Sequence, residues 1–275
     1  MTSPHNVLSA AIVIPVYREP LTADEQVSLR HLLRFLGGYE RFIVAPQSLA
    51  ISIPGFGIRR FDDAFFTGTA SYSRLLLSRQ FYEAFSGYEY ILIYQLDALV
   101  FSDQLVEWCA AGYDYIGAPW LKDKNHPQRG FSRCGNGGFS LRRVESFLRV
   151  LGSGRYVSEP VPYLTDLLRT PLADVRHRFR GLARLVKRAR VLRQVRQGAE
   201  AYAAAYSLNE DHFWSDRARL FYPDFRIAPV DAGLRFAFER APRYCFEQNG
   251  RQLPFGCHAW ARWDRAFWEP YLLEV

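Results

Sequence analysis

An aspartate that follows an apolar run is the first candidate for chemistry in this chain of 275 residues. The segment 90–101 reads YILIYQLDALVF, and the residues before Asp97 are typical of an inner strand that is covered on both faces. Open α/β sheets bind ligands at the carboxyl ends of such strands. We therefore predict that Asp97 faces a binding crevice, although an Asp here could also cap a helix or pair with an Arg.

Two adjacent carboxylates at the start of an expected helix form the second candidate. A carboxylate on a rigid helix start can take a proton from a hydroxyl group, so we predict that Asp211 is a general base and that Glu210 orients the acceptor or the helix. An acidic pair in a first turn also stabilises the helix dipole, which would be a purely structural use. Trp214, one turn later, could form a platform for a sugar ring or pack in the core.

A glycine pair and a histidine complete the set of candidates. Asn136-Gly137-Gly138 could let the backbone approach a ligand closely, but the same three residues also make a common tight turn. His258 stands among turn and aromatic residues, where it could bind a metal or make a structural hydrogen bond.

The elements that must position these residues alternate between strand and helix. Apolar runs predict strands at 10–17, 41–46, 57–61, 90–97 and 114–119. Apolar spacing and capping residues predict helices at about 22–36 and 71–85, after Ser102, and from Arg142 to Gly152. A pair of strands is expected around Phe225 to Phe238. This order predicts an α/β fold with a mostly parallel central sheet flanked by helices.

Composition indicates one large domain with a substantial core, which we place at residues 1–275. Hydrophobic residues make up 49% of the chain and aromatic residues 16%, which excludes fibrous and disordered classes. The four cysteines show no C-x-x-C pair, so we expect reduced thiols in a cytoplasmic protein. No run reaches the roughly 18 to 20 apolar residues that cross a bilayer, and the start of the chain lacks a basic leader, so we expect neither secretion nor a membrane span.

The net charge of +7 belongs to one segment. Between residues 172 and 196 there are nine Lys or Arg against one Asp, a net of +8, so the rest of the chain sums to about −1. Apolar residues at helical spacing make this segment an amphipathic, cationic helix within a helical basic insertion at 153–206. We expect it to bind an anionic membrane at the inner face of the cell membrane, although it could be a simply solvated helix. Nucleic acid is not expected, because no aromatic residues are interleaved as in a nucleic-acid module.

Together these segments resemble the nucleotide-sugar-dependent glycosyltransferases of the GT-A class. Residues 12–17, IVIPVY, resemble the first strand and nucleotide loop, and Gln95-Leu-Asp97 stands where the family has Asp-x-Asp. Residues 136–142, NGGFSLR, resemble the glycine-rich motif on the acceptor side, and Glu210-Asp211 stands where inverting members keep an acidic pair. The resemblance covers most of the chain apart from the basic insertion. It is closest to a bacterial group of GT-A-like proteins known mainly as a domain of unknown function.

The resemblance implies a GT-A-like, Rossmann-like fold and a glycosyltransferase activity. The sugar would pass from a nucleotide-sugar donor to a hydroxyl group of a saccharide or lipid-linked saccharide, with inversion, in the synthesis of a bacterial surface polysaccharide or glycolipid. The residues expected at the donor are Pro15, Tyr17, Arg18, Arg74, Gln95 and Asp97. The residues expected at the acceptor are Asn136, Gly137, Gly138, Arg142 and Trp214.

The departing nucleoside diphosphate needs its negative charge stabilised, and Mg²⁺ or Mn²⁺ held by carboxylate and imidazole commonly does this. The resemblance implies that Asp97 and His258 are the metal ligands. Gln95 stands in place of one acid, and a neutral amide is a poorer ligand for a hard cation, so metal independence is the alternative. The cations that would then carry the diphosphate charge are Arg18, Arg74 and Arg142.

Two other functions stay open from the sequence. A sugar-phosphate nucleotidyltransferase shares the parallel-sheet layout, but it would show a glycine-rich loop after the first strand, and residues 15–20 contain no glycine. A non-catalytic, membrane-associated protein of the same fold that binds a sugar or nucleotide would explain the missing acid at Gln95.

Overall fold

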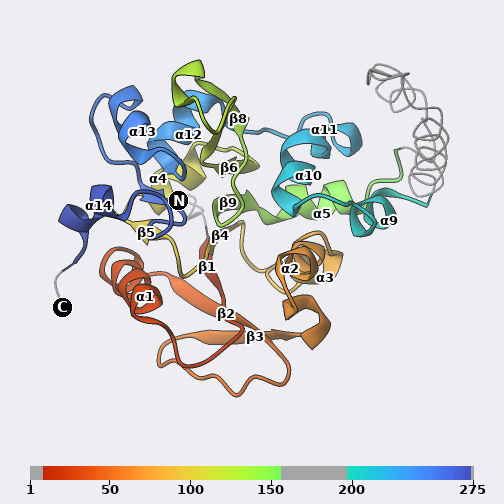
Figure 1. Ribbon diagram of the computed structural model, residues 1–275. Coiled ribbons are helices and arrows are strands. Elements are labelled where there is room, and N and C mark those ends of the chain that lie inside the picture. The colour runs from red at the N-terminus through yellow and green to blue at the C-terminus, as the bar shows by residue number, and fades with distance from the viewer. Residues whose placement is uncertain (1–8, 156–196, 274–275) are drawn as a thin grey trace, which may run out of the picture.

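A six-stranded sheet forms the centre of the molecule (Figure 1). The structure is a computed structural model that describes residues 9–155 and 197–273. The strands, in their order across the sheet, are β3 (Gly57–Phe61), β2 (Glu40–Pro46), β1 (Ala10–Pro15), β4 (Tyr90–Tyr94), β9 (Phe139–Arg143) and β6 (Tyr115–Gly117). Strands β1 to β4 pair in parallel, and β9 lies antiparallel between β4 and β6. The predicted α/β fold with a mainly parallel sheet is confirmed.

Two small sheets extend this centre. One is made of β10 (Ala237–Phe238), β11 (Gly256–Cys257) and β5 (Leu99–Val100). The other is a hairpin of β7 (Pro119–Leu121) and β8 (Phe131–Cys134). Because β5 follows Asp97 closely and β11 precedes His258, the first small sheet brings these two residues together although they are far apart in the sequence.

Helices cover both faces of the main sheet. Those of the first half are α1 (Ala23–Leu36), α2 (Thr69–Leu76), α3 (Arg79–Glu83), α4 (Leu105–Ala110) and α5 (Val144–Leu151). Those of the second half are α9 (Ala199–Ala204), α10 (Glu210–Asp216), α11 (Ala218–Phe221), α12 (Val230–Phe236), α13 (Pro242–Gln248) and α14 (Arg265–Trp268). Three single 3₁₀ turns are η1 (Asp63–Phe66), η2 (Pro127–Arg129) and η3 (Glu269–Tyr271). The predicted capping box before α1 is present, with Thr22 and Glu25 bonded to each other's backbone N–H groups.

The two faces of the sheet carry separate apolar cores, because successive side chains of a strand point to opposite faces. Ala11 and Val13 of β1 belong to the core under α2, α3, α5, α10 and α11. Ile12 and Ile14 belong to the core under α1, α4 and α12. All four side chains are 0–1% exposed, as expected for an inner strand between two layers of helices.

Two element predictions are wrong. Of the strand pair expected around 225–238, only Ala237–Phe238 is a strand, β10, and Val230–Phe236 form the helix α12. Gly233 lets this helix lie directly against the Cys134 sulfur of β8. The expected helix at 71–85 is two helices, because the chain turns at Leu77-Ser78 between α2 and α3. The expected basic helix at 172–196 lies outside the described residues, and so does most of the insertion expected at 153–206.

Candidate functional site

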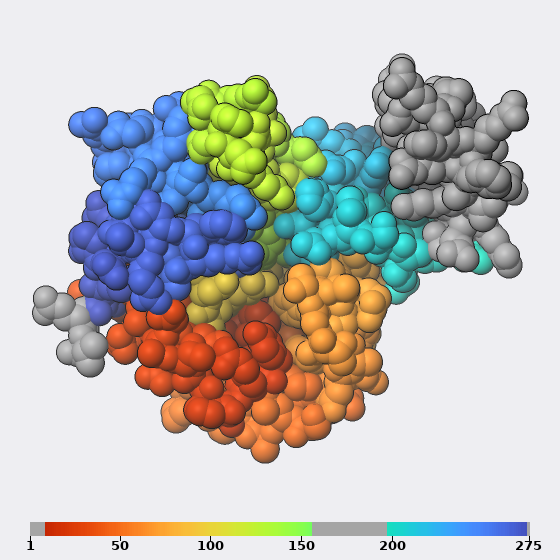
Figure 2. All heavy atoms as spheres, viewed as in Figure 1, coloured from red at the N-terminus to blue at the C-terminus, as the bar shows by residue number. Residues whose placement is uncertain are grey.

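A cleft of about 580 Å³ opens where β1 and β4 end (Figure 2). Its walls come from the loops after these strands, the first turns of α1 and α2, and the segment 259–262 near the end of the chain. Five of the six residues expected at the donor line this cleft, namely Pro15, Tyr17, Arg18, Gln95 and Asp97. Arg74 does not line it; its side chain lies on an exposed face of α2.

The carboxylates that line the cleft are already paired with cations. The pairs are Glu25–Arg18 at 2.9 Å, Asp24–Arg265 at 2.5 Å and Asp97–His258 at 3.2 Å. Arg262 also lines the cleft, and in the described part of the chain no carboxylate lies within ion-pair distance of its guanidinium group. Arg262 is therefore the cation best placed to meet a negatively charged ligand. Arg262 was not among the residues predicted from the sequence, where its only signal was its place four residues after His258.

His258 is the centre of the polar contacts at one end of the cleft. Its Nε2 lies 3.1 Å from the amide oxygen of Gln95 and 3.2 Å from Oδ1 of Asp97, and its Nδ1 lies 3.5 Å from Oε1 of Glu239. Burial alone would lower the pKa of His258, but the carboxylates of Asp97 and Glu239 raise it to about 10. The imidazole therefore holds a proton at neutral pH. Glu239 was not among the sequence candidates.

The expected metal ligands, Asp97 and His258, do lie together, but they do not form a complete cation site. Among residues 9–155 and 197–273 no group of three or more His, Cys, Asp or Glu side chains is arranged to hold a metal ion. The nearest further oxygen is the amide of Gln95, and a neutral amide is a poorer ligand for a hard cation than a carboxylate. These residues as arranged do not fit a divalent cation, and dependence on Mn²⁺ or Mg²⁺ stays a prediction.

The glycine pair joins the cleft to helix α10. A methyl group on Gly138 would collide with the His258 ring, and one on Gly137 would collide with the carboxylate of Glu210. The side chain of Asn136 accepts a hydrogen bond from the Gly138 N–H at 3.1 Å and so fixes the turn. Gly137 and Gly138 are thus needed for contacts inside the protein, and whether they also contact an acceptor stays a prediction.

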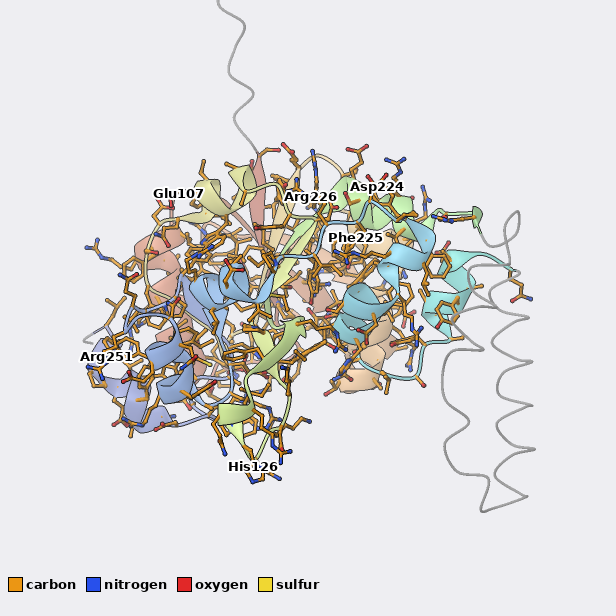
Figure 3. The ribbon with its side chains drawn as sticks, turned by 90° about the horizontal axis from the view of Figure 1, so that it is seen from above. Glu107, His126, Asp224, Phe225, Arg226 and Arg251 are labelled. Atoms are coloured by element: carbon orange, nitrogen blue, oxygen red, sulfur yellow. The ribbon has the colours of Figure 1, made fainter. Side chains whose placement is uncertain are left out.

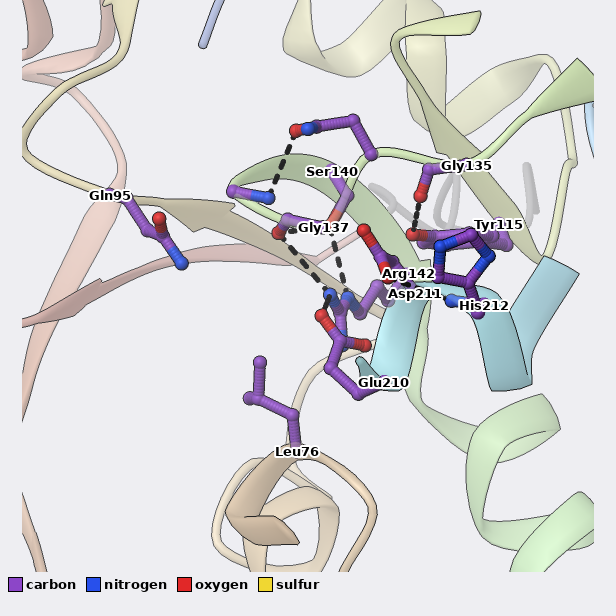
Figure 4. A network of polar contacts seen from close by, with 12 residues as sticks. Leu76, Gln95, Tyr115, Gly135, Gly137, Ser140, Arg142, Glu210, Asp211 and His212 are labelled. Carbon is purple, nitrogen blue, oxygen red and sulfur yellow. Dashed lines mark hydrogen bonds and ion pairs between the residues drawn. The ribbon is translucent and has the colours of Figure 1, made fainter. Parts of the chain in front are cut away.

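Arg142 lies at the centre of a buried polar network behind this turn (Figure 4). Its guanidinium group donates to Glu210 Oε1 at 2.9 Å, to the Tyr82 hydroxyl at 3.0 Å, to Ser140 Oγ at 3.0 Å and to the Gly137 carbonyl at 3.3 Å. The side chain is 0% exposed. The expected contact between Arg142 and an acceptor or diphosphate is therefore corrected, because every side of the guanidinium is occupied by protein and none faces solvent.

Trp214 needs the same correction. The indole is 0% exposed and packs against Phe147, with ring centroids 4.1 Å apart, in the core beneath α10. It cannot present a face to a sugar from there. The aromatic residue that stands on the outer side of α10 is Trp120 of β7, whose ring stacks on His212.

The two carboxyl groups in the first turn of α10 have raised pKa values. Burial raises the pKa of Glu210 to about 7 even though Arg142 opposes this, and burial raises the pKa of Asp211 to about 6. A carboxylate that titrates near pH 6 is well matched to accept a proton near neutrality. Asp211 does not line the cleft itself, but the charges of Glu239 and His258 reach it, which places it near the His258 end of the cleft.

The fold and the position of the cleft define the structural class. A mainly parallel sheet flanked by helices, with the cleft at the carboxyl ends of β1 and β4, is the GT-A glycosyltransferase fold, as expected. The chain belongs to the family described as "Protein of unknown function (DUF5672)", whose model matches residues 55–258. No curated protein matches the chain.

Solved structures of glycosyltransferases are similar to this chain over nearly its whole length. A structure of an active-site mutant of LgtC is 12% identical, with 96% of this chain and 97% of that chain covered and a TM-score of 0.50. Galactosyltransferase LgtC in complex with donor and acceptor sugar analogs has the same identity and coverage, with a TM-score of 0.49. Mouse xyloside xylosyltransferase 1 is 14% identical, with 91% and 97% covered and a TM-score of 0.45. At 12% identity the likeness to the LgtC mutant structure, with its TM-score of 0.50, establishes the fold alone.

Proposed function

We propose that this chain is a glycosyltransferase that moves a sugar from a nucleotide-sugar donor to a hydroxyl group of an acceptor. The observation that carries the proposal is the pairing of an open cleft with a nearby, partly buried acid. The cleft holds the cation Arg262 and the carboxylate of Asp97. The acid is Asp211, whose pKa of about 6 suits proton transfer.

The donor would occupy the cleft with its diphosphate toward Arg262. The volume of about 580 Å³ is in the range of small-molecule sites. Tyr17 is 57% exposed beside the cleft, where its ring can stack on a base. Asp97 is half exposed and can accept hydrogen bonds from ribose or sugar hydroxyl groups, while the protonated His258 beside it offsets its charge.

In the transfer step the acceptor oxygen would form a bond to the anomeric carbon while the bond from that carbon to the phosphate oxygen breaks. The hydroxyl proton passes to a carboxylate oxygen of Asp211, and the electron pair of the broken bond leaves with the nucleoside diphosphate. Arg262 stabilises the growing negative charge on that leaving group. Attack from the side opposite the leaving group gives inversion. Glu210 holds the start of α10 in place through Arg142 and does not need to touch the acceptor.

The proposed acceptor is supported by the resemblance to the GT-A class alone, and the proposed cellular place is supported by the charge of one segment. We propose a saccharide or lipid-linked saccharide of a bacterial surface polysaccharide or glycolipid, and action at the inner face of the cell membrane. The support for the membrane is the net charge of +8 at 172–196, which at about 1 kcal/mol per basic residue can hold a protein on acidic lipid. In residues 9–155 and 197–273 no helix is long and apolar enough to cross a bilayer. Deletion of 172–197 should abolish co-sedimentation with anionic liposomes, and unchanged partitioning would remove the membrane from the proposal.

A second candidate is a non-catalytic protein that binds a nucleotide or sugar in the same cleft. The specific observation in its favour is that Asp211 does not line the cleft, while Gln95 stands in place of an acid. Both candidates predict that a nucleotide sugar binds in the cleft, but only the enzyme requires release of nucleoside diphosphate that depends on Asp211.

Two measurements, made one after the other, test the proposed function. A thermal-shift screen of nucleotide sugars, with and without Mn²⁺, reports binding, because a ligand of the native state raises the melting temperature. Arg262→Gln should abolish the shift, while Arg235→Gln, which removes an exposed cation remote from the cleft, should not. Release of nucleoside diphosphate from the bound donor should then fall by about 10²- to 10⁴-fold in Asp211→Asn with binding unchanged.

The outcomes separate the candidates. Binding with no Asp211-dependent release favours the binding protein. No shift with any nucleotide sugar in either condition contradicts both candidates.

A further inference from the structure

The β7–β8 arm, defined as residues 119–134, projects from the body next to the first turn of α10. Figure 3 shows His126 at the end of this arm, at the edge of the molecule. At the base of the arm Trp120 stacks on His212, with ring centroids 4.4 Å apart and an interplanar angle of 27°. The arm is therefore attached to the turn that carries Asp211, on the side that faces solvent.

The attachment has a second component on the same helix. Arg133 forms an ion pair with Asp216, with 2.6 Å between Nε and Oδ1, and its guanidinium lies 4.8 Å from the centre of the Trp120 ring. Ser215 Oγ also donates to the Cys134 carbonyl at 3.0 Å. These contacts span both strands of the arm, so its base and α10 form one unit.

The charge of the arm is strongly positive. Its charged residues are Lys122, Lys124, Arg129 and Arg133 against Asp123, a net of +3 with His126 neutral. Asp123 is already shared by Arg129 at 2.9 Å and His126 at 3.0 Å, and Arg133 is held by Asp216. The two remaining cations of the arm are the exposed Lys122 and Lys124.

Lys122 and Lys124 have no carboxylate within ion-pair distance in the described part of the chain. The charge of Lys124 reaches the base of the arm: burial lowers the pKa of His212, and the positive charges of Arg133 and Lys124 add to this against Asp216. The unpaired charge of Lys124 thus acts on His212, which is the neighbour of Asp211 in the sequence.

This placement matters because the proposed base is itself negative when it works. An acceptor that carries its own negative charge would be repelled by the carboxylate of Asp211 unless cations nearby compensate. A neutral sugar needs no such compensation. Lysine ammonium groups on flexible stems bind phosphate and carboxylate groups as point charges without strict geometry.

We propose that Lys122 and Lys124 of the β7–β8 arm bind an anionic group, a phosphate or a carboxylate, on the saccharide acceptor while its hydroxyl group meets Asp211. This rests on the proposed function, because Asp211 defines the acceptor side. The arm then selects anionic acceptors, and the cleft selects the donor.

The test is a binding measurement that does not require turnover. The full-length chain is labelled with 5-fluorotryptophan, and the ¹⁹F signal of Trp120, assigned with Trp120→Phe, is followed while glucose, glucose 6-phosphate or glucuronic acid is added. At least one anionic sugar should move this signal at concentrations where glucose does not. Lys122→Gln/Lys124→Gln should weaken that binding by about five-fold or more, as expected for two exposed charge contacts. Arg251→Gln, an exposed cation on a different part of the surface (Figure 3), should leave it unchanged.

Three results would overturn the proposal: equal affinity for glucose and both anionic sugars, wild-type affinity in the double-lysine variant, or no movement of the Trp120 signal with any probe. Arg262→Gln separates the arm from the cleft, since binding at the arm should persist in this variant. If nucleotide binding fails while anionic sugars still bind at Trp120, the proposed function falls and the anion site stands. If nucleotide binds and the anionic sugars do not, only the role of the arm is lost.

Discussion

Two arginine–glutamate pairs flank the candidate site, and they differ in exposure rather than in distance. Arg18 and Glu25 lie 2.9 Å apart on the wall of the cleft, with side chains 45% and 17% exposed. Arg142 and Glu210 also lie 2.9 Å apart, but their side chains are 0% and 7% exposed. The same type of ion pair is therefore partly exposed to solvent at Arg18–Glu25 and buried inside the protein at Arg142–Glu210.

The difference indicates different tasks. An exposed pair is screened by solvent and salt, so the Arg18–Glu25 pair can separate or form again at little cost when the charge in the cleft changes. A buried pair has lost the hydration of both ions, and it is tolerable only because Arg142 is hydrogen-bonded by several further groups. The cleft wall is thus built from adjustable charges, whereas α10 and its acids are held by a fixed network.

The largest effect is expected when the buried pair loses its cation. Arg142→Met should lower the free energy of unfolding by about 3–5 kcal/mol, because Glu210 is left buried with no cation, whereas Arg18→Met should cost less than about 1 kcal/mol. Urea denaturation followed by tryptophan fluorescence measures both values.

Arg142→Met/Glu210→Met is the control for this comparison, since it removes both charges and should recover part of the loss. Arg143→Met is a matched neighbour on the same strand, with a partly exposed side chain paired to Glu89, and should behave like Arg18→Met. If Arg142→Met and Arg143→Met cost the same, burial is not what separates the two sides of the site.

A smaller loss is expected at the turn that joins the two sides. Gly138→Ala places a methyl group against the His258 ring, while the Gly138 carbonyl is tied to the Gln95 N–H at 2.9 Å, so neither can move freely. We expect a cost of about 1–3 kcal/mol, typical of overpacking. Gly38→Ala is the matched control, because no atom lies within 4 Å of the position of its added methyl group. Equal melting temperatures for the two variants would contradict the close contact at Gly138.

The carboxyl group of Asp211, in the first turn of α10, should control how the rate of donor consumption depends on pH. Burial raises the pKa of Asp211 to about 6, so its basic form is lost as pH falls through that value. The rate of donor consumption should fall about tenfold per pH unit below pH 6 and level off above it. The raised value also means that the folded state holds this proton more tightly than the unfolded state, so the contribution of Asp211 to stability declines as pH rises from about 4 to 6. A rate that is flat between pH 5 and 7 would remove Asp211 as the base.

Five of the six strands of the main sheet were predictable from the sequence, because apolar runs do not depend on distant residues. The segment 90–94 is one example, and the exit toward Asp97 at the sheet edge follows from it. The inner strand β9 was not predicted, because its sequence FSLRR contains Ser140 and Arg142, which only the fold shows to be buried. α12 was not predictable in the same way. In the fold its Gly233 packs closely against Cys134, which is about a hundred residues away in the sequence, and such a contact leaves no local signal.

The site residues likewise fall into those that the local sequence could predict and those that depend on the fold. Tyr17, Arg18 and Asp97 were predictable as cleft residues because the carboxyl ends of parallel strands meet at one edge of a sheet. The burial of Arg142 and Trp214 could not be predicted. The sequence does not distinguish an arginine or tryptophan that faces solvent from one that is buried among hydrogen-bond partners or apolar side chains. Arg262 and Glu239 were missed because only the fold carries the end of the chain back to the cleft.

The smallest effect is expected from a substitution at the exposed Arg18–Glu25 pair on the cleft wall. It distinguishes the exposed pair from the buried pair, because it should change ligand affinity rather than the free energy of unfolding. Arg18→Gln removes one partner of Glu25, but Glu25 keeps its hydrogen bonds to Thr22 in the capping box, so the free energy of unfolding should change by less than about 0.5 kcal/mol. The freed carboxylate makes the cleft more negative, and the affinity for a nucleoside diphosphate should fall by about three-fold at low salt. At about 0.5 M salt screening acts over about 4 Å, and the difference from the unmodified chain should vanish in isothermal titration. A loss that persists at high salt would mean that Arg18 contacts the ligand directly, and that the exposed pair is part of the binding surface rather than a screen of adjustable charge.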